Sequence, residues 1–475
     1  MIVPRVRVAA AASAALLAAL PLASCAGEVE RRGRRISDDT AVRSVDPTAV
    51  AGLTAQTRFE QDTTRRVYAA YPRVPGANAL TKRLAAVVEE QVRPFTALTT
   101  SAPPLADGGV PELNVQWSLT AASRQVVGVR LVTWQYLGVS GGEARQTLWY
   151  DGATRTAHTS ADLIDGRAGL TALAERVRDR LGSRANPAQV RADEATFPSL
   201  AFNEAGDMVV EFGDYTVAPG SAGRVAVTLP RSVYDPMLSP FGRRARDAAL
   251  ATPARPTTTA PELAAARPVP GPVDCSHAKC IALTFDDGPG RYTRELLRTL
   301  AARRARATFF VVGDNAAADP GLLRDAAAAG NELGNHTQAH RDLTRLPTMQ
   351  INSDVQRTQD VLRTALGRCP TLLRPPYGAT NTTVSSVAKS LDLVQVLWSI
   401  DPGDWRMRDP ERIASRVVER ARPGAVVVLH ESRKPTIGAV PRILDRLARQ
   451  GYSFVTVSEL MAGREIPIGG HFSGM

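Results

Sequence analysis

The C-terminal part of the chain alternates short apolar runs with amphipathic segments. The runs IALTF (281–285), TFFVV (308–312) and AVVVL (425–429) are each followed by a loop or a stretch of helical periodicity, such as TRELLRTLAARR (293–304). About seven strands recur in this way, and strands that alternate with helices are typical of a parallel sheet with covering helices. Because seven or eight such units close most simply into a barrel, we predict an α/β barrel here.

Ionisable side chains cluster where these predicted strands end. They are Asp286 and Asp287 after IALTF, His336 and His340 after ELGN, Arg374 after TLL, Asp401 and Asp404 after VLWSI, and His430 after AVVVL. The carboxyl ends of the strands of a parallel barrel open on one face, and active sites occur at that face. The sequence therefore predicts one active site to which five loops contribute.

His336 and His340 are candidate metal ligands. Their i, i+4 spacing puts both imidazoles on one side of a helical turn or tight loop, although the pair alone is a weak signal. A carboxylate from Asp286 or Asp287 completes a His₂Asp set with an open position, the pattern of a catalytic zinc site. The competing interpretation is a solvated acidic DDGP turn, which the presence of the other loops disfavours.

Five short motifs occur in order in this part of the chain. They are TFDDGPG (284–290), HTQAH (336–340), RPPYG (374–378), DPGDW (401–405) and VLH (428–430). Together they resemble the five motifs of the polysaccharide deacetylases, the NodB homology domain or carbohydrate esterase family 4. The resemblance implies a catalytic domain at residues 274–465 with the family's distorted (β/α)7-type barrel of fewer than eight units, which agrees with the strand pattern.

The resemblance implies a role for each residue that matches the first three motifs. Asp287, His336 and His340 would bind the metal, which in this family is usually Zn²⁺, with Co²⁺ or Ni²⁺ as substitutes. Asp286 would be the general base, and Arg374 would pair with it and keep it ionised.

The last three motifs supply the remaining groups. The backbone N–H of Tyr377 would help to bind the oxyanion, and Tyr377 and Trp405 would line the pocket. Trp405 would form the side of the pocket that receives the acetyl methyl group. His430 would be the general acid, oriented by Asp404 or, alternatively, by Asp401.

The reaction implied by these roles is hydrolysis of an N-acetyl amide to acetate and a free amino sugar. The metal would polarise the carbonyl and lower the pKa of water to about 7. The sequence departs from the family at Val428, where Leu is usual. This change trims the methyl pocket slightly and leaves the reacting groups in place.

Residues 1–25 read as a bacterial export signal. Arg5 and Arg7 precede an apolar stretch that is short for a membrane span and has the proportions of a secretory signal. The closing LASC resembles a lipobox, in which Cys25 is diacylated and becomes the new N-terminus. We expect a lipoprotein anchored on the outer face of the bacterial membrane, with plain secretion and a retained anchor helix as alternatives.

The substrate is expected to be an N-acetylated glycan polymer. A lipid-anchored enzyme outside a bacterial membrane meets peptidoglycan first, so we predict peptidoglycan, with a chitooligosaccharide as the alternative and acetylated xylan as a further candidate. A rival from another class is a non-catalytic lipoprotein that senses or binds wall fragments. The intact base, metal triad and acid argue against that rival. We expect the protein to be a monomer.

The rest of the chain divides by composition. Residues 26–55 are polar and predict a tether, and residues 56–245 combine predicted strands and helices into a smaller α+β accessory domain. Six prolines at 246–273 indicate a linker, and 466–475 is predicted to be a tail. The accessory domain would be a positioning or wall-binding module, or a spacer.

The net charge of +11 comes from 58 basic and 47 acidic side chains that are spread along the chain. This charge predicts attraction to an anionic cell wall or lipid headgroup layer; the alternative interpretation is a basic surface with no such partner. Nucleic acid is not an expected partner, because no Arg-rich run is interleaved with aromatic residues. Cys275 and Cys280 lie five residues apart before the first barrel strand, and an exported protein can keep them oxidised, so we predict a disulfide between them.

Overall fold

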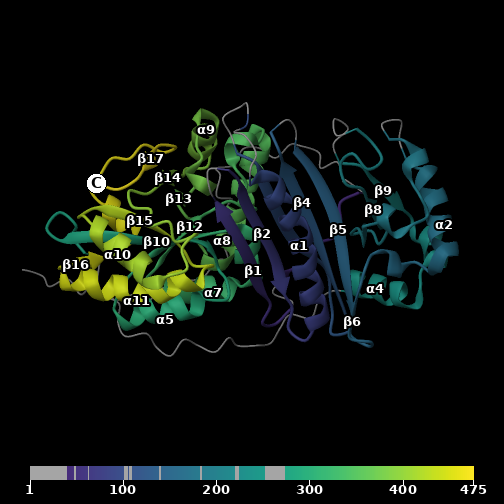
Figure 1. The fold of residues 1–475 in the computed structure, drawn as a ribbon, viewed down its shortest axis with the longest axis horizontal. Coiled ribbons are helices and arrows are strands. Elements are labelled where there is room, and N and C mark those ends of the chain that lie inside the picture. The colour runs from purple at the N-terminus through teal and green to yellow at the C-terminus, as the bar shows by residue number, and fades with distance from the viewer. Residues whose placement is uncertain are drawn as a thin grey trace, which may run out of the picture.

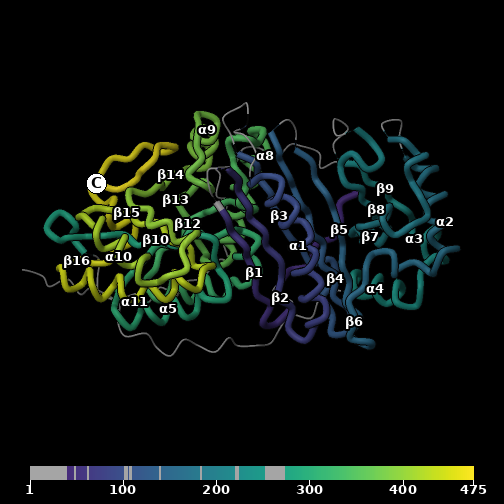
Figure 2. Tube along the Cα trace, viewed as in Figure 1, coloured from purple at the N-terminus to yellow at the C-terminus, as the bar shows by residue number. Residues whose placement is uncertain are grey.

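The computed structural model describes residues 40–47, 50–61, 64–100, 105, 110–138, 141–181, 185–219, 224–251 and 273–475. The predicted export signal with Cys25, most of the predicted tether and most of the predicted linker lie outside these residues. Figures 1 and 2 show two units side by side: the accessory domain, which spans residues 40–251, and a barrel domain, residues 273–475. Across the described ranges, no helix is both long enough and apolar enough to cross a membrane.

A six-stranded sheet in the order β1-β2-β3-β4-β5-β6 forms the centre of the accessory domain. Its strands are β1 (Thr54–Gln61), β2 (Arg66–Arg73), β3 (Glu112–Ala122), β4 (Val126–Tyr136), β5 (Gly141–Asp151) and β6 (Thr156–His158). β2 and β3 pair in parallel, and the helix α1 (Asn78–Thr99) crosses between them and packs on the sheet. Successive residues of a strand face opposite sides of the sheet. Accordingly, Leu148 and Tyr150 join the core beneath α1, whereas Trp149 joins a second core.

The second core lies between this sheet and a smaller layer. That layer holds a three-stranded antiparallel sheet and three helices: β7 (Ser199–Phe202), β8 (Met208–Glu211), β9 (Ala226–Leu229), α2 (Gly166–Arg178), α3 (Arg231–Tyr234) and α4 (Pro240–Leu250). Phe197, Phe212 and Tyr234 are fully buried in it. The accessory domain therefore has the mixed α and β character that was predicted.

The barrel domain is a parallel sheet in the order β15-β10-β11-β12-β13-β14-β17, with β16 paired to β10. Its strands are β10 (Lys279–Gly288), β11 (Thr308–Val311), β12 (Glu332–Asn335), β13 (Leu372–Leu373), β14 (Val394–Val396), β15 (Ala425–His430), β16 (Tyr452–Phe454) and β17 (His471–Phe472). Bridges from Ile400 to Val427 and from Gly474 to Ala425 bring the two ends of this order together. The distorted (β/α)7-type barrel predicted from the sequence is confirmed.

Helices surround this sheet (Figure 1). They are α5 (Thr293–Ala302), α6 (Gly313–Ala318), α7 (Pro320–Ala328), α8 (Thr348–Leu366), α9 (Thr382–Ser390), α10 (Pro410–Arg420), α11 (Lys434–Arg449) and α12 (Val457–Met461). Their apolar faces pack on the sheet: Leu296 and Leu300 of α5 and Ile443 of α11 share one core with Phe285 of β10. The disulfide predicted between Cys275 and Cys280 is present, and it joins the segment before β10 to the first buried residue of that strand.

Two segments differ from their predictions. Residues 466–475 are not a loose tail, because β17 pairs in parallel with β14 and buries Phe472. The backbone edge of β14 thereby gains a partner. The end of the predicted tether also packs on the accessory domain: Val45 bridges to Leu119, and β1 begins within the tether at Thr54.

Candidate active site

The candidate site lies at the carboxyl ends of the barrel strands. The register of β10 with β15 sets Asp286 directly opposite His430. β12 ends one residue before His336, and β13 ends one residue before Arg374. The parallel sheet therefore brings the predicted residues to one face, where barrel enzymes have their active sites.

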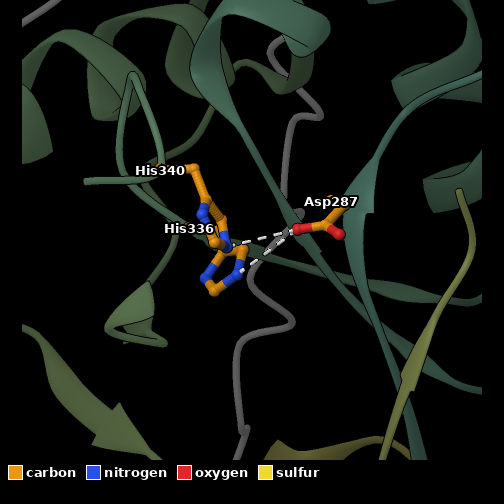
Figure 3. Close-up of side chains that lie close together, drawn as sticks. All are labelled: Asp287, His336 and His340. Carbon is orange, nitrogen blue, oxygen red and sulfur yellow. Dashed lines mark ion pairs between the residues drawn. The ribbon is translucent and has the colours of Figure 1, made fainter. Parts of the chain in front are cut away.

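Three of these side chains converge on one point (Figure 3). One ligand atom from each of Asp287, His336 and His340 lies within 4.8 Å of the others. The Oδ1 atom of Asp287 is 3.3 Å from Nε2 of His340 and 3.9 Å from Nε2 of His336. A tetrahedral ion with bonds of about 2.0–2.1 Å keeps its ligand atoms about 3.3 Å apart. The spacing therefore suits a single divalent ion bound by all three.

The hydrogen bonds around the triad also fit a cation. The Oδ1 atom of Asp287 is buried and has no hydrogen-bond partner, which is costly for a carboxylate unless a cation binds it. The Nδ1 atom of His336 lies 2.6 Å from the carbonyl oxygen of Arg374. A carbonyl only accepts, so Nδ1 carries the proton and the lone pair of Nε2 faces the triad.

Burial shifts the titration of all three ligands. It raises the pKa of Asp287 to about 7, opposed by the positive charge of His430 and assisted by neighbouring carboxylates. It also lowers the pKa of His336 and, more strongly, that of His340. The imidazoles are therefore neutral and can bind a metal, and a bound cation would offset the cost of ionising Asp287.

The backbone of the site is unusual as well. Asp287, Thr337, His340 and Tyr377 have φ values of 74°, 65°, 53° and 62°, in the left-handed region that non-glycine residues rarely adopt. Such conformations cost free energy and cluster at functional sites, where the surrounding structure holds them. Here they set the direction of two triad side chains and of the turn at Tyr377.

Asp286 is held in place by Arg374. The Nη1 atom of Arg374 donates to Oδ1 of Asp286 at 2.8 Å and to the hydroxyl of Thr284 at 2.6 Å, and the guanidinium is fully buried. The other carboxylate oxygen, Oδ2, lies 3.8 Å from Nε2 of His336. Asp286 therefore directs a free oxygen to the triad, the arrangement that a general base needs.

His430 is oriented by Asp404 and not by Asp401. The Oδ1 atom of Asp404 lies 2.8 Å from Nδ1 of His430, and its Oδ2 accepts from the His430 backbone N–H and the Thr436 hydroxyl. Asp401 instead accepts the backbone N–H of Gly403, an interaction internal to its own turn. Of the two alternatives left open by the sequence, the geometry selects Asp404.

The predicted pocket residues surround these groups. The ring of Tyr377 meets that of His340 edge-on, with centroids 4.8 Å apart. Val428 is buried on β15, two residues before His430 and therefore on the same face of the strand. Trp405 is half-buried, and both it and Tyr377 pack against the core of the accessory domain.

Comparison with known proteins agrees with this geometry. The family model described as polysaccharide deacetylase matches residues 274–396. The peptidoglycan-N-acetylmuramic acid deacetylase PdaC of Bacillus subtilis is 30% identical over 385 residues, which cover 78% of this chain and 80% of PdaC. This chain belongs to the polysaccharide deacetylase family.

Other members match a shorter part of this polysaccharide deacetylase. The peptidoglycan-N-acetylglucosamine deacetylase PgdA of Listeria monocytogenes is 38% identical over 192 residues, so the match spans only 40% of each chain. A chitooligosaccharide deacetylase of Bradyrhizobium is 34% identical over 39% of this chain and 93% of its own. A solved structure of PdaC is 38% identical over 40% of this chain and 92% of that chain, with a TM-score of 0.38.

The sequence did not reveal that the accessory domain contributes residues to the surroundings of the deacetylase site. Two of these residues contact the loop that carries His340: Tyr68 of β2 stacks on His340, and Asn114 of β3 donates to the carbonyl oxygen of Ala339. Two others contact nearby site residues: Phe59 of β1 stacks on His430, and Arg66 of β2 lies over the ring of Tyr377. The alternation of residues within β1 and β2 does not distinguish them from ordinary strands of a sheet. The one usable signal is Phe59 and Tyr68 as aromatic residues on strands next to a sheet edge.

Proposed function

We propose that this protein is a metal-dependent hydrolase that removes acetyl groups from an N-acetylated cell-wall polysaccharide. The observation that carries the proposal is the convergence of Asp287, His336 and His340 on one buried point, with a free oxygen of Asp286 beside them. Three protein ligands next to a carboxylate base favour hydrolysis. A role in glycan binding alone does not account for the buried, unpaired oxygen of Asp287.

The chain's own groups perform the proton transfers. A divalent ion bound by the triad supplies Lewis-acid chemistry that polarises the amide carbonyl. Asp286 accepts a proton from the attacking water through Oδ2, the oxygen that Arg374 does not engage. His430 donates from Nε2 to the departing nitrogen, since Asp404 occupies its Nδ1. The backbone N–H of Tyr377 is our candidate for binding the oxyanion.

Peptidoglycan is the substrate that we favour. The named relatives PdaC and PgdA are peptidoglycan deacetylases, and an exported enzyme at the membrane surface meets the wall first. A chitooligosaccharide is the second candidate, because a chitooligosaccharide deacetylase is 34% identical across almost its whole length. The sugar that bears the acetyl group, N-acetylmuramic acid or N-acetylglucosamine, differs between PdaC and PgdA.

We also propose that the protein is a monomeric lipoprotein on the outer face of the membrane. The support is the sequence of residues 1–25, with its basic start, apolar stretch and Cys25 in LASC. Globomycin, which blocks lipoprotein signal cleavage, should cause an uncleaved form to accumulate in a bacterial host. A Cys25→Ser variant that is still labelled by radioactive palmitate would contradict the assignment.

Acetate release tests the proposed function directly. The full chain, loaded separately with Zn²⁺, Co²⁺ or Ni²⁺, is incubated with purified peptidoglycan and with chitotetraose, and acetate is measured enzymatically. We expect acetate from at least one substrate, with free amino groups appearing in equal amount. A metal-loaded protein that releases none from either glycan, in the wild type and in a Phe59→Ala variant alike, would refute the proposal.

The pH profile should show that His430 acts as an acid. Burial alone lowers the pKa of His430, but the charge and hydrogen bond of Asp404, with the charges of Asp287 and Asp286, raise it to about 9. The protonated form therefore persists to about pH 9, and activity falls above it. Asp404→Asn removes the main raising effect, so the alkaline limb of kcat/KM should move down by at least about one pH unit.

A matched variant separates the effect of the charge of Asp404 from the effect of a hydrogen bond to that carboxylate. Thr436→Val loses its hydrogen bond to Asp404 but leaves that carboxylate charged. Its alkaline limb should move less than that of Asp404→Asn. Equal profiles for wild type and Asp404→Asn would exclude His430 as the acid.

A further inference from the structure

One edge of the accessory domain lies directly on the candidate active site. The ring of Phe59 in β1 stacks on His430 with centroids 4.9 Å apart and on Tyr377 at 6.1 Å, and it meets His340 edge-on at 5.5 Å. Figure 1 shows β1 and β2 as the part of the accessory domain that faces the barrel. Phe59 thus contacts the predicted acid, a triad ligand and a pocket residue at once.

The next strands extend this contact. Tyr68 of β2 stacks on His340 with centroids 4.4 Å apart, and its hydroxyl accepts a hydrogen bond from Asn315 at 3.2 Å. The side-chain amide of Asn114 in β3 donates to the carbonyl oxygens of Ala339 and His340 at 2.9 and 3.2 Å. These contacts fix the loop that carries the second histidine of the triad.

An ion pair at the edge of the interface adds a third kind of contact between the accessory domain and the barrel domain. Arg66 of β2 pairs with Asp342 of the barrel and lies over the ring of Tyr377, with 4.5 Å between its guanidinium carbon and the ring centroid. Asp342 follows His340 by two residues. The same loop is therefore held by stacking, by hydrogen bonds and by opposite charge, and all three come from the accessory domain.

The reacting groups are closed off from solvent in this structure. The exposed fraction is 3% for Asp286, 1% for Asp287 and 6% for His430. A cavity of about 300 Å³ at the same junction is lined by residues 57–60 of β1 and 432–435 of the barrel, which leaves β1 itself as one wall. A sugar polymer must place its acetamido group within hydrogen-bond reach of these atoms, and Phe59 lies in the way.

We infer that β1 and β2 form an autoinhibitory cap on the active site, with Phe59 in the position that the acetylated sugar must occupy. The inference rests on the proposed function. The protein alternates between this closed form and an open form in which β1 and β2 have left the barrel face. Only the open form binds glycan, so the apparent affinity is reduced by the fraction of molecules that are open.

Two variants of the full chain test the cap through different contacts. Phe59→Ala removes the ring that covers His430, and Arg66→Ala removes the ion pair at the edge. Each should raise kcat/KM for acetate release from chitotetraose by about tenfold or more, because a larger fraction of molecules is open. Phe241→Ala is the matched control: this aromatic packs in the second core of the accessory domain and should leave kcat/KM unchanged.

Hydrogen–deuterium exchange provides a readout that does not depend on turnover. In metal-loaded Asp286→Asn protein, saturating chitotetraose should increase exchange at the amides of residues 54–61, since bound sugar displaces β1. Where the wild type releases acetate, values of kcat/KM at or below wild type for both cap variants would overturn the cap. Unchanged exchange in β1 would overturn it in every case. If sugar exposes β1 but neither wild type nor the cap variants release acetate from chitotetraose or from peptidoglycan, the cap stands and the proposed function fails.

Discussion

We expect Asp286→Asn to lower kcat for acetate release by about 10²–10⁴-fold, the contribution of a well-placed general base. An asparagine has nearly the same shape as an aspartate, and its oxygen can still accept the hydrogen bond of Arg374. It cannot take a proton from water. Metal content should not change, because the triad does not include Asp286. Acetate release and metal analysis on the same preparation measure both quantities.

Stability must be measured alongside this variant. Arg374 is fully buried, and removing the charge of its partner leaves a buried cation without a counter-ion. Breaking a buried pair costs about 3–5 kcal/mol, so urea unfolding should show a lower free energy of unfolding for Asp286→Asn. Asp360→Asn, a neutralised carboxylate on the barrel surface, is the control and should keep full activity. A folded Asp286→Asn protein with more than about a tenth of wild-type kcat would exclude Asp286 as the base.

The sequence could predict the site because its parts are locally encoded. Each of Asp286, His336 and His430 sits at or directly after the end of a short predicted strand, and the parallel arrangement of such strands places their ends together. The i, i+4 spacing of the two triad histidines likewise needs only a tight turn. For these residues, the local sequence pattern was enough to predict their position in the fold.

Other features depend on contacts between distant segments. Asp404 and Asp401 lie in one motif, and only the turn between them decides which carboxylate reaches His430. Residues 471–472 form a strand because β14 offers a free edge, which no local pattern at the end of the chain indicates. The stacking of Phe59 on His430 joins residues 371 positions apart and requires both domains to be folded and docked.

Removing one histidine of the triad should abolish activity through loss of the metal. With His336→Ala, two ligands remain, and we expect affinity for Zn²⁺ to fall by more than about 100-fold, since even changes behind a ligand cost 10–100-fold. Acetate release should fall about 10³-fold or more, because a Lewis acid supplies several kcal/mol of transition-state stabilisation. Chelation of the wild-type protein should have the same effect, reversed when the ion is returned.

His158→Ala is the matched control for this variant, because His158 lies in the accessory domain and pairs with Asp162 away from the barrel. It should bind one ion per chain and release acetate at the wild-type rate. Thermal melting then distinguishes loss of metal binding from damage to the fold. Wild type loaded with Zn²⁺ should melt at a higher temperature than its metal-free form, and His336→Ala should show no such difference. A His336→Ala protein that still binds one ion tightly and is stabilised by it would mean that the ion sits elsewhere. The ion would then not lie beside the base Asp286 and the acid His430, and the assignment of the protein as a hydrolase would be wrong.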